Sequence, residues 1–106
     1  MNVSKSEFQR ETVPDDSPDT SYLEQDGFED RLRAYRRGDF GFIGVRAAID
    51  LDIPTKQGGF IGQRITSPGL WGIEDDSDET YLREVYEEEC AQLVEMLETL
   101  GVTVED

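Results

Sequence analysis

The sequence predicts an α+β fold in which a small antiparallel β-sheet, built from a hairpin and a short edge strand, is covered on one face. An N-terminal helix and a long, acidic C-terminal helix are expected to form that cover. Three observations support this prediction. Apolar residues alternate over 40–53, a turn and a second apolar run follow at 55–66, and helical spacing dominates from 81 to 100.

The first residues of the chain are predicted to form a tail. Residues 1–20 contain two prolines and few apolar side chains, so they bury too little surface to offset the entropy of ordering. A chain of 106 residues allows one domain, which we expect to occupy residues 21–106.

A first helix is expected within residues 21–37. Its end is rich in arginine, which suits the negative end of a helix dipole, and Gly38 is a natural stop. The apolar residues that predict this helix fall at i, i+4 and i+7 on one face: Phe28, Leu32 and Tyr35.

Strands are predicted next. Residues 40–53 have the period-two pattern of a strand with one buried face, and Pro54 ends it. The turn at 55–59 is short, so a second strand at 60–66 is expected to pair with the first as an antiparallel hairpin. Residues 70–73 predict a short edge strand. The expected buried face of the first strand consists of Ile43, Val45, Ala47, Ile49, Leu51 and Ile53.

The last helix is the element that the sequence marks most clearly. Asp76 or Ser77 is expected to cap it, with Glu79 completing a capping box, and Gly101 is expected to close it. About 23 residues would give a rod roughly 34 Å long. The apolar residues at helical spacing are Tyr81, Leu82, Val85, Tyr86, Cys90, Leu93, Val94, Leu97 and Leu100.

Negative charge is concentrated in the C-terminal third of the chain. The whole chain has a net charge of −15, from 25 acidic and 10 basic residues. Residues 1–20 contribute −3, residues 21–73 contribute 0, and residues 74–106 contribute −12. Such a field repels nucleic acid and anionic lipid and attracts basic surfaces. We therefore expect a basic protein partner and no direct binding to nucleic acid or membrane.

The sequence gives little support for an enzyme, a cofactor or a metal site. It has no histidine, and its one cysteine, Cys90, lies on the apolar stripe of the last helix, where it is expected to be a small core residue. Within Asp75–Glu79, Asp76 and Asp78 alternate as the first ligands of an EF-hand loop do, but Tyr81 stands where that loop needs glycine. The structural interpretation, acidic residues at a helix N-terminus, is stronger.

The cytoplasm is the predicted location. No apolar run approaches the ~20 residues of a membrane span, and the first residues lack the apolar core of a signal peptide. A single thiol also fits a reducing compartment.

A row of carboxylates on the last helix is the candidate binding site. Duplex DNA carries one charge per ~1.7 Å of axis, so a rigid rod bearing carboxylates is a coarse copy of a phosphate strand. Phe42 is added as an interface residue, because it lies on the strand face opposite Ile43. The candidate acidic residues are Asp75, Asp76, Asp78, Glu79, Glu84, Glu87, Glu88, Glu95 and Glu98.

Three segments resemble a group of small uncharacterised acidic proteins carried by bacterial phages and plasmids. These segments are Phe42–Ala47, Leu70–Glu79 and Tyr81–Val85, and the resemblance extends over residues 21–101. It implies a mobile element in a bacterial host, and no established function or functional residue. Small acidic proteins of such elements include DNA mimics that block restriction or CRISPR nucleases.

Three hypotheses follow from these observations. The first is a non-enzymatic inhibitor from a phage or mobile element, which mimics DNA and occupies the basic channel of a nucleic-acid-binding defence protein. The second is a self-associating structural or regulatory module, a homodimer in which the acidic helix meets the Arg31–Arg37 cluster of another copy. The third is a salt-adapted acidic domain, which would gain stability in molar salt.

Overall fold

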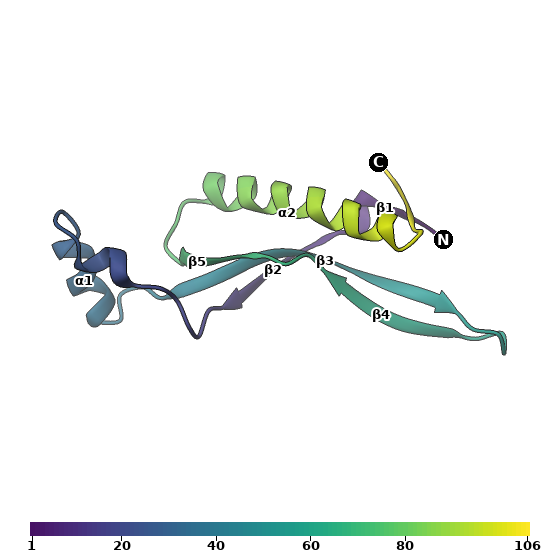
Figure 1. Cartoon of the computed structure of the whole chain (residues 1–106), viewed down its shortest axis with the longest axis horizontal. Coiled ribbons are helices and arrows are strands. Elements are labelled where there is room, and N and C mark those ends of the chain that lie inside the picture. The colour runs from purple at the N-terminus through teal and green to yellow at the C-terminus, as the bar shows by residue number, and fades with distance from the viewer.

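A computed structural model describes residues 1–106 and confirms the α+β class. The molecule is elongated, with extents of 59 × 25 × 19 Å (Figure 1). Two short 3₁₀ turns, at Lys5–Glu7 and Ser21–Glu24, accompany the main elements. The helices and strands are β1 (Asn2–Ser4), β2 (Gln9–Pro14), α1 (Glu29–Arg36), β3 (Phe42–Pro54), β4 (Phe60–Thr66), β5 (Leu70–Glu74), α2 (Glu79–Thr99) and β6 (Thr103–Glu105).

β3 is the central strand of the four-stranded antiparallel sheet. β2 pairs with one edge of β3, from Gln9 opposite Ala48 to Pro14 opposite Ile43. β4 and β5 share the other edge: β4 pairs with residues 48–54, and β5 pairs with residues 42–45 through an irregular register. The predicted hairpin and the predicted short edge strand are therefore both present.

The prediction of a polar tail over residues 1–20 is wrong for residues 2–14. β1 pairs in parallel with β6, and Val3 is buried against Val102 at that end of the core. The side chains of β2 are exposed or half-buried, so the strand is held mainly by its backbone hydrogen bonds to β3. Composition could not reveal this strand, because the β3 residues that pair with it lie roughly 30 to 40 residues away in the sequence.

The main core lies between one face of the sheet and α2. Ala47, Ile49 and Leu51 of β3 pack against Leu93 and Leu97 of α2. A second cluster continues this layer toward the start of α2 and contains Val45, Ile73 and Val85. The predicted inward face of β3 is thus correct from residue 45 to residue 51. Ile53 lies further along the hairpin, where it is 38% exposed.

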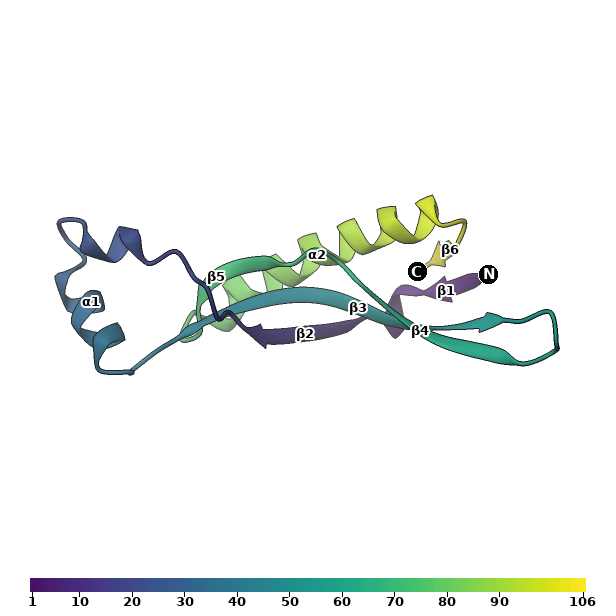
Figure 2. The ribbon, with the colours of Figure 1, turned by 60° about the horizontal axis from the view of Figure 1, so that its bottom comes forward.

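The first helix is shorter than predicted, and it covers only the start of β3, at Phe42. Gly27, at φ +95°, separates the Ser21–Glu24 turn from α1. Figure 2 shows α1 beyond the end of the sheet, where it packs on the entry to β3. The cluster there contains Leu23, Phe40 and Phe42, with Leu32 and Tyr35 against it. α2 alone therefore covers the sheet face.

α2 begins and ends close to its predicted bounds. Asp78 is the N-cap, in place of the predicted Asp76 or Ser77, and its side chain accepts a hydrogen bond from the backbone N of Tyr81 at 2.9 Å. Gly101, at φ +88°, follows the helix as predicted. No helix in the structure combines the length and the apolar character required to cross a membrane.

Replacing Gly44 with alanine should destabilise the fold. A Cβ atom at Gly44 would lie 2.3 Å from Cε3 of Trp71, so the indole must move. Overpacking of this kind typically costs about 1–3 kcal/mol. Urea unfolding of Gly44→Ala should show that loss, with red-shifted emission from the chain's one tryptophan. Gly62→Ala is the matched control, because its new Cβ meets nothing within 4 Å.

Candidate functional site

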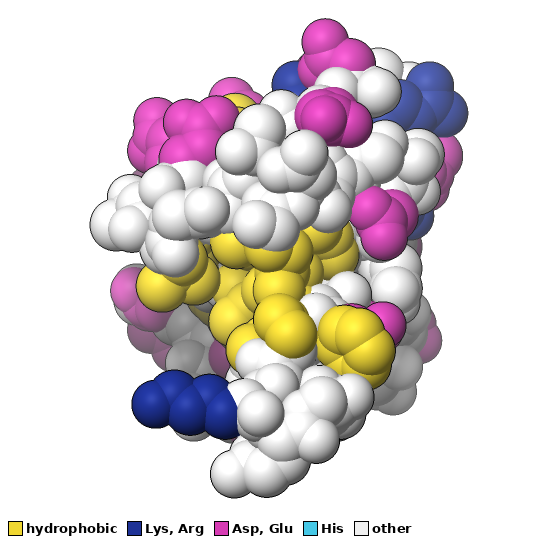
Figure 3. Space-filling view, turned by 90° about the vertical axis from the view of Figure 1, so that its right-hand side faces the viewer, with side chains coloured by type: hydrophobic (Ala, Val, Ile, Leu, Met, Phe, Trp, Pro, Cys, Tyr) yellow, Lys and Arg dark blue, Asp and Glu magenta, His cyan; other side chains and the backbone are white.

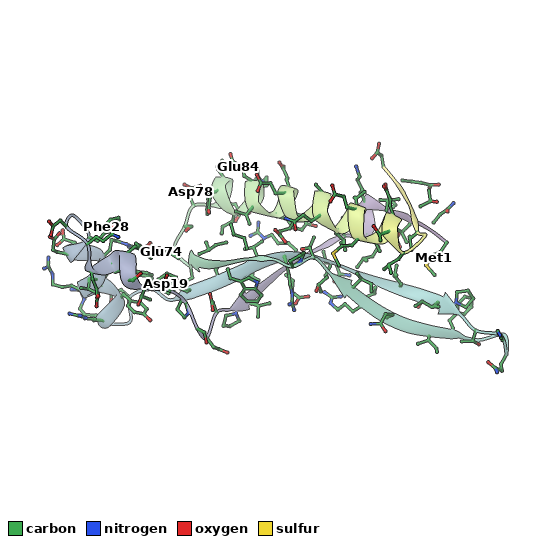
Figure 4. The ribbon with its side chains drawn as sticks, viewed as in Figure 1. Met1, Asp19, Phe28, Glu74, Asp78 and Glu84 are labelled. Atoms are coloured by element: carbon green, nitrogen blue, oxygen red, sulfur yellow. The ribbon has the colours of Figure 1, made fainter.

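The outward face of α2 carries five exposed carboxylates that form no ion pair within the chain. At about 100° per residue they fall within an arc of about 100°, and the buried Leu93 lies roughly opposite its centre. In Figure 4 the Glu84 side chain points away from the sheet. We call this set the acidic ridge; its members are Glu84, Glu87, Glu88, Glu95 and Glu98.

The spacing of the acidic ridge is comparable with that of one DNA strand. Glu84 and Glu98 are separated by about 21 Å along the helix axis. The five charges over that length lie about 5 Å apart on average, against about 3.4 Å between charges on a single strand of B-DNA. The ridge has one gap, between Glu88 and Glu95, and the exposed Ala91 lies at the centre of the stripe there.

The acidic cluster before α2 differs from the ridge, because the chain's own arginines neutralise part of it. Arg31 donates two hydrogen bonds to Asp76, at 2.9 and 3.1 Å, and its guanidinium lies 3.9 Å from the centroid of the Phe40 ring. Arg31 also pairs with Glu74 at 2.5 Å. Hydrogen bonds from Arg31 hold the pKa of Asp76 below its ordinary value.

The other members of this cluster have separate roles. Glu79 pairs with Arg10 of β2 at 2.5 Å, and that hydrogen bond lowers the pKa of Glu79. Asp78 is occupied as the helix cap. Asp75 is exposed and forms no ion pair. The nine predicted acidic residues thus divide into the free ridge, the free Asp75 and a structural set around the start of α2.

The assignment of Phe42 to an exposed interface is wrong. Its side chain is 6% exposed, and its ring lies 5.3 Å from that of Tyr35 and 5.7 Å from that of Phe40. Strand alternation placed Phe42 correctly on the face opposite Ile43. That face is covered at this point by α1 and the segment before it, which the local pattern could not show.

Glu89 is a buried carboxylate that the sequence analysis overlooked. It is 4% exposed and accepts hydrogen bonds from Ser67 Oγ at 2.8 Å and from the backbone N of Gly69 at 2.6 Å. Gln92 donates to its second oxygen at 3.2 Å. A signal for it was present, because Glu89 stands four residues from both Val85 and Leu93 on the apolar stripe.

Two further reactive groups, Cys90 and Tyr86, pack against the main core. Cys90 is half-buried against the core, and burial raises the pKa of its thiol. Burial also raises the pKa of the neighbouring Tyr86 to about 12. No three histidine, cysteine, aspartate or glutamate side chains converge in a way that would hold a metal ion.

Comparison with known proteins identifies no relative: the chain matches no protein-family model, no curated protein and no solved structure. The resemblance of residues 21–101 to small acidic proteins of phages and plasmids stays a prediction.

Removing the Glu89 carboxylate should destabilise the fold more than neutralising it. Glu89→Ala leaves the Gly69 N–H and the Ser67 hydroxyl without their acceptor, which we expect to cost about 2–3 kcal/mol. Glu89→Gln keeps one acceptor oxygen in place and should remain within about 1 kcal/mol of the wild type. Urea denaturation of both variants tests this expectation. If both variants lost the same unfolding free energy, the contribution of Glu89 would come from its charge and not from its hydrogen bonds.

The ion pair between Arg31 and Asp76 should stabilise the fold near neutral pH and lose this effect in acid, where Asp76 becomes protonated. Because the folded pKa of Asp76 is lowered from 3.8, the stabilisation is complete above that value and is lost as the pH falls through the folded pKa. The difference in unfolding free energy between wild type and Arg31→Gln should therefore be constant near neutral pH and shrink below about pH 4. Denaturation at a series of pH values measures it, and Arg36→Gln, whose arginine forms no ion pair, is the control.

Proposed function

We propose that this protein is a non-enzymatic binding protein whose acidic ridge occupies the basic cleft of a nucleic-acid-binding protein in place of nucleic acid. The observation that carries the proposal is that no ridge carboxylate forms an ion pair, although α2 carries one basic residue, Arg83. The five ridge carboxylates are exposed on one face of a 21-residue helix, and none of the chain's arginines or lysines pairs with them. Fixed, unpaired charge on a rigid rod attracts a basic surface without the entropy loss of ordering a flexible tail.

The rigidity of the ridge has a definite structural source. Val85, Leu93 and Leu97 anchor the opposite face of α2 in the core, and Glu89 binds it to the turn between β4 and β5. The carboxylates therefore keep a fixed spacing, as phosphates on a duplex do. In the setting that the resemblance implies, the target would be a defence protein such as a restriction or CRISPR complex.

The internal ion pairs weigh against self-association through the arginine cluster. That hypothesis needs Arg31–Arg37 to be free for the acidic helix of another copy. Arg31 binds Glu74 and Asp76, Arg33 pairs with Asp30, and Arg37 pairs with Asp39. Only Arg36 of the cluster lacks an ion pair, so little unpaired positive charge is left for α2 of a second copy.

Changing the charge of the ridge should change affinity for the partner in both directions. If each carboxylate contributes about 0.5–1 kcal/mol at a partly desolvated interface, Glu84→Gln, Glu87→Gln and Glu88→Gln together should weaken binding roughly 10- to 100-fold. Ala91→Glu fills the gap in the ridge and should strengthen binding several-fold. Affinities would be measured, as a function of salt, for proteins captured from a nuclease-treated, heparin-binding fraction of a bacterial lysate.

The matched control removes three exposed, unpaired acidic residues from elsewhere in the chain: Asp16→Asn, Glu24→Gln and Asp26→Asn. This control has the same net charge as the ridge variant and should retain most of the affinity. The captured protein should also release a labelled DNA duplex when the wild-type chain is added. Equal weakening by both triple variants, or no competition with the duplex, would contradict the proposal.

A further inference from the structure

One long edge of the sheet has no partner within the chain. β4 is the last strand on its side of β3, over seven residues from Phe60 to Thr66. One backbone hydrogen bond lies at each end of the β3–β4 pairing: Ser67 N donates to Ala47 O, and Thr55 N donates to Gly59 O. These two bonds determine which residues of β4 form hydrogen bonds with β3. By alternation, the odd-numbered residues of β4 bond to β3. The N–H and C=O groups of residues 60, 62, 64 and 66 therefore point outward.

This edge lacks the features that protect edge strands from pairing. Proteins usually block an exposed edge with proline, a bulge, or a charge that projects from it. β4 contains no proline and pairs with β3 without a bulge. Its one charged side chain, Arg64, is held over the sheet by Asp50 at 2.9 Å and Glu11 at 3.0 Å. In contrast, β2 ends in Pro14, and the register between β5 and β3 is irregular.

An apolar surface continues from this edge. The hairpin projects past the end of α2, leaving Ile53 and its cross-strand partner Ile61 uncovered, with Ile61 60% exposed. Phe60 is 71% exposed on the other face of the hairpin. Apolar side chains gather in a hollow at this end of the molecule (Figure 3). A groove of about 440 Å³ lies nearby, lined by Pro68, Gln92, Glu95, Met96, Thr99 and Leu100.

Charge separates the hairpin tip and β4 from the rest of this acidic chain, although the β3 arm carries Asp50 and Asp52. Residues 53–73 contain no acidic residue, although the chain has 25 in total. Lys56, at the hairpin tip, forms no ion pair, whereas the groove beside Pro68 carries Glu95. The hairpin tip over residues 53–60, which is apolar and carries Lys56 as its one charged residue, is thus complementary to a groove that is apolar and acidic. Both surfaces belong to the same chain, which is the condition for a self-complementary twofold interface.

We infer that the protein forms a homodimer by antiparallel pairing of β4 with β4 of a second copy. The twofold axis passes beside Gln63, so that Gln63 faces the partner's Gln63 and Ile61 faces the partner's Ile65. The two four-stranded sheets then form one continuous sheet. The hairpin tip of each copy reaches the Pro68 groove of the other, which brings Lys56 toward the partner's Glu95.

The shape of the single chain supports this assignment. Its radius of gyration is 17.9 Å, against about 13 Å for a compact domain of this length. The excess comes from the α1 end and from the projecting hairpin, and pairing through β4 covers the hairpin. Of the acidic ridge, only Glu95 lines the groove that the partner's hairpin tip reaches, so the other four carboxylates stay exposed in the dimer. This inference does not rest on the proposed function.

Sedimentation equilibrium on the full chain tests the dimer. The wild type should have twice the mass of the 12.0 kDa chain, and its association should tighten with salt, because two acidic copies repel each other. Gly62→Pro removes an outward N–H at the open edge and should raise the dissociation constant at least tenfold. Gly62→Ala keeps that N–H and should leave the dissociation constant unchanged. A wild type that is monomeric at all concentrations, or a dimer unaffected by Gly62→Pro, overturns the inference.

A cross-linking experiment keeps the test independent of how Gly62→Pro folds. Directly opposed residues that form a non-hydrogen-bonded pair have Cα atoms about 4.5 Å apart, which allows a disulfide. In a Cys90→Ala background, Gln63→Cys should therefore oxidise to a covalent dimer. Lys56→Cys is the control, because the twofold axis separates the two copies of residue 56 by roughly 40 Å. Cross-linking of Gln63→Cys no faster than that of Lys56→Cys overturns the inference.

Discussion

The Glu89 carboxylate lies between α2 and the sheet, and the arrangement of both depends on it. Ser67 Oγ accepts a hydrogen bond from the backbone N of Ala47 in β3 and donates one to Glu89, which also accepts from the backbone N of Gly69. This chain of bonds joins the central strand, the turn from β4 to β5, and the long helix. Because β4 and β5 share one edge of β3, the turn between them must be held closely. The contact that holds it also sets which face of α2 meets the core.

The rotation of α2 determines which carboxylates are free. With Val85, Glu89, Leu93 and Leu97 directed inward, the ridge glutamates are turned to solvent, far from the arginines of the sheet. Those arginines are used elsewhere. Arg46 pairs with Glu11, and Arg64 pairs with Glu11 and Asp50, on the sheet face opposite α2. The fold therefore separates charge: most arginines are paired within the sheet and near α1, and the unpaired ridge carboxylates remain on α2.

The two ends of the molecule have different characters, which follow from the same elongated design. Near α1, Arg31 holds Glu74 and Asp76 over an aromatic cluster, so that end is closed by aromatic packing and ion pairs. At the other end the hairpin extends past the helix, with an open strand edge and exposed isoleucines. An acidic ridge and a hairpin tip without acidic residues are compatible on one small chain, because the first suits a cationic target and the second suits another copy.

The sequence by itself determined the elements whose signals are local. Alternation over β3, the turn before β4 and the apolar stripe of α2 predicted these elements nearly to their observed bounds, and helical spacing placed the ridge glutamates on one outward face. Tertiary structure alone decided the rest. β2 is held by a strand far away in the sequence, Phe42 is covered by α1, Glu89 is buried through partners near residue 67, and Asp76 and Glu79 are neutralised by Arg31 and Arg10. Periodicity reports which way a side chain points, whereas burial and charge pairing depend on what lies there, and long-range contacts supply that.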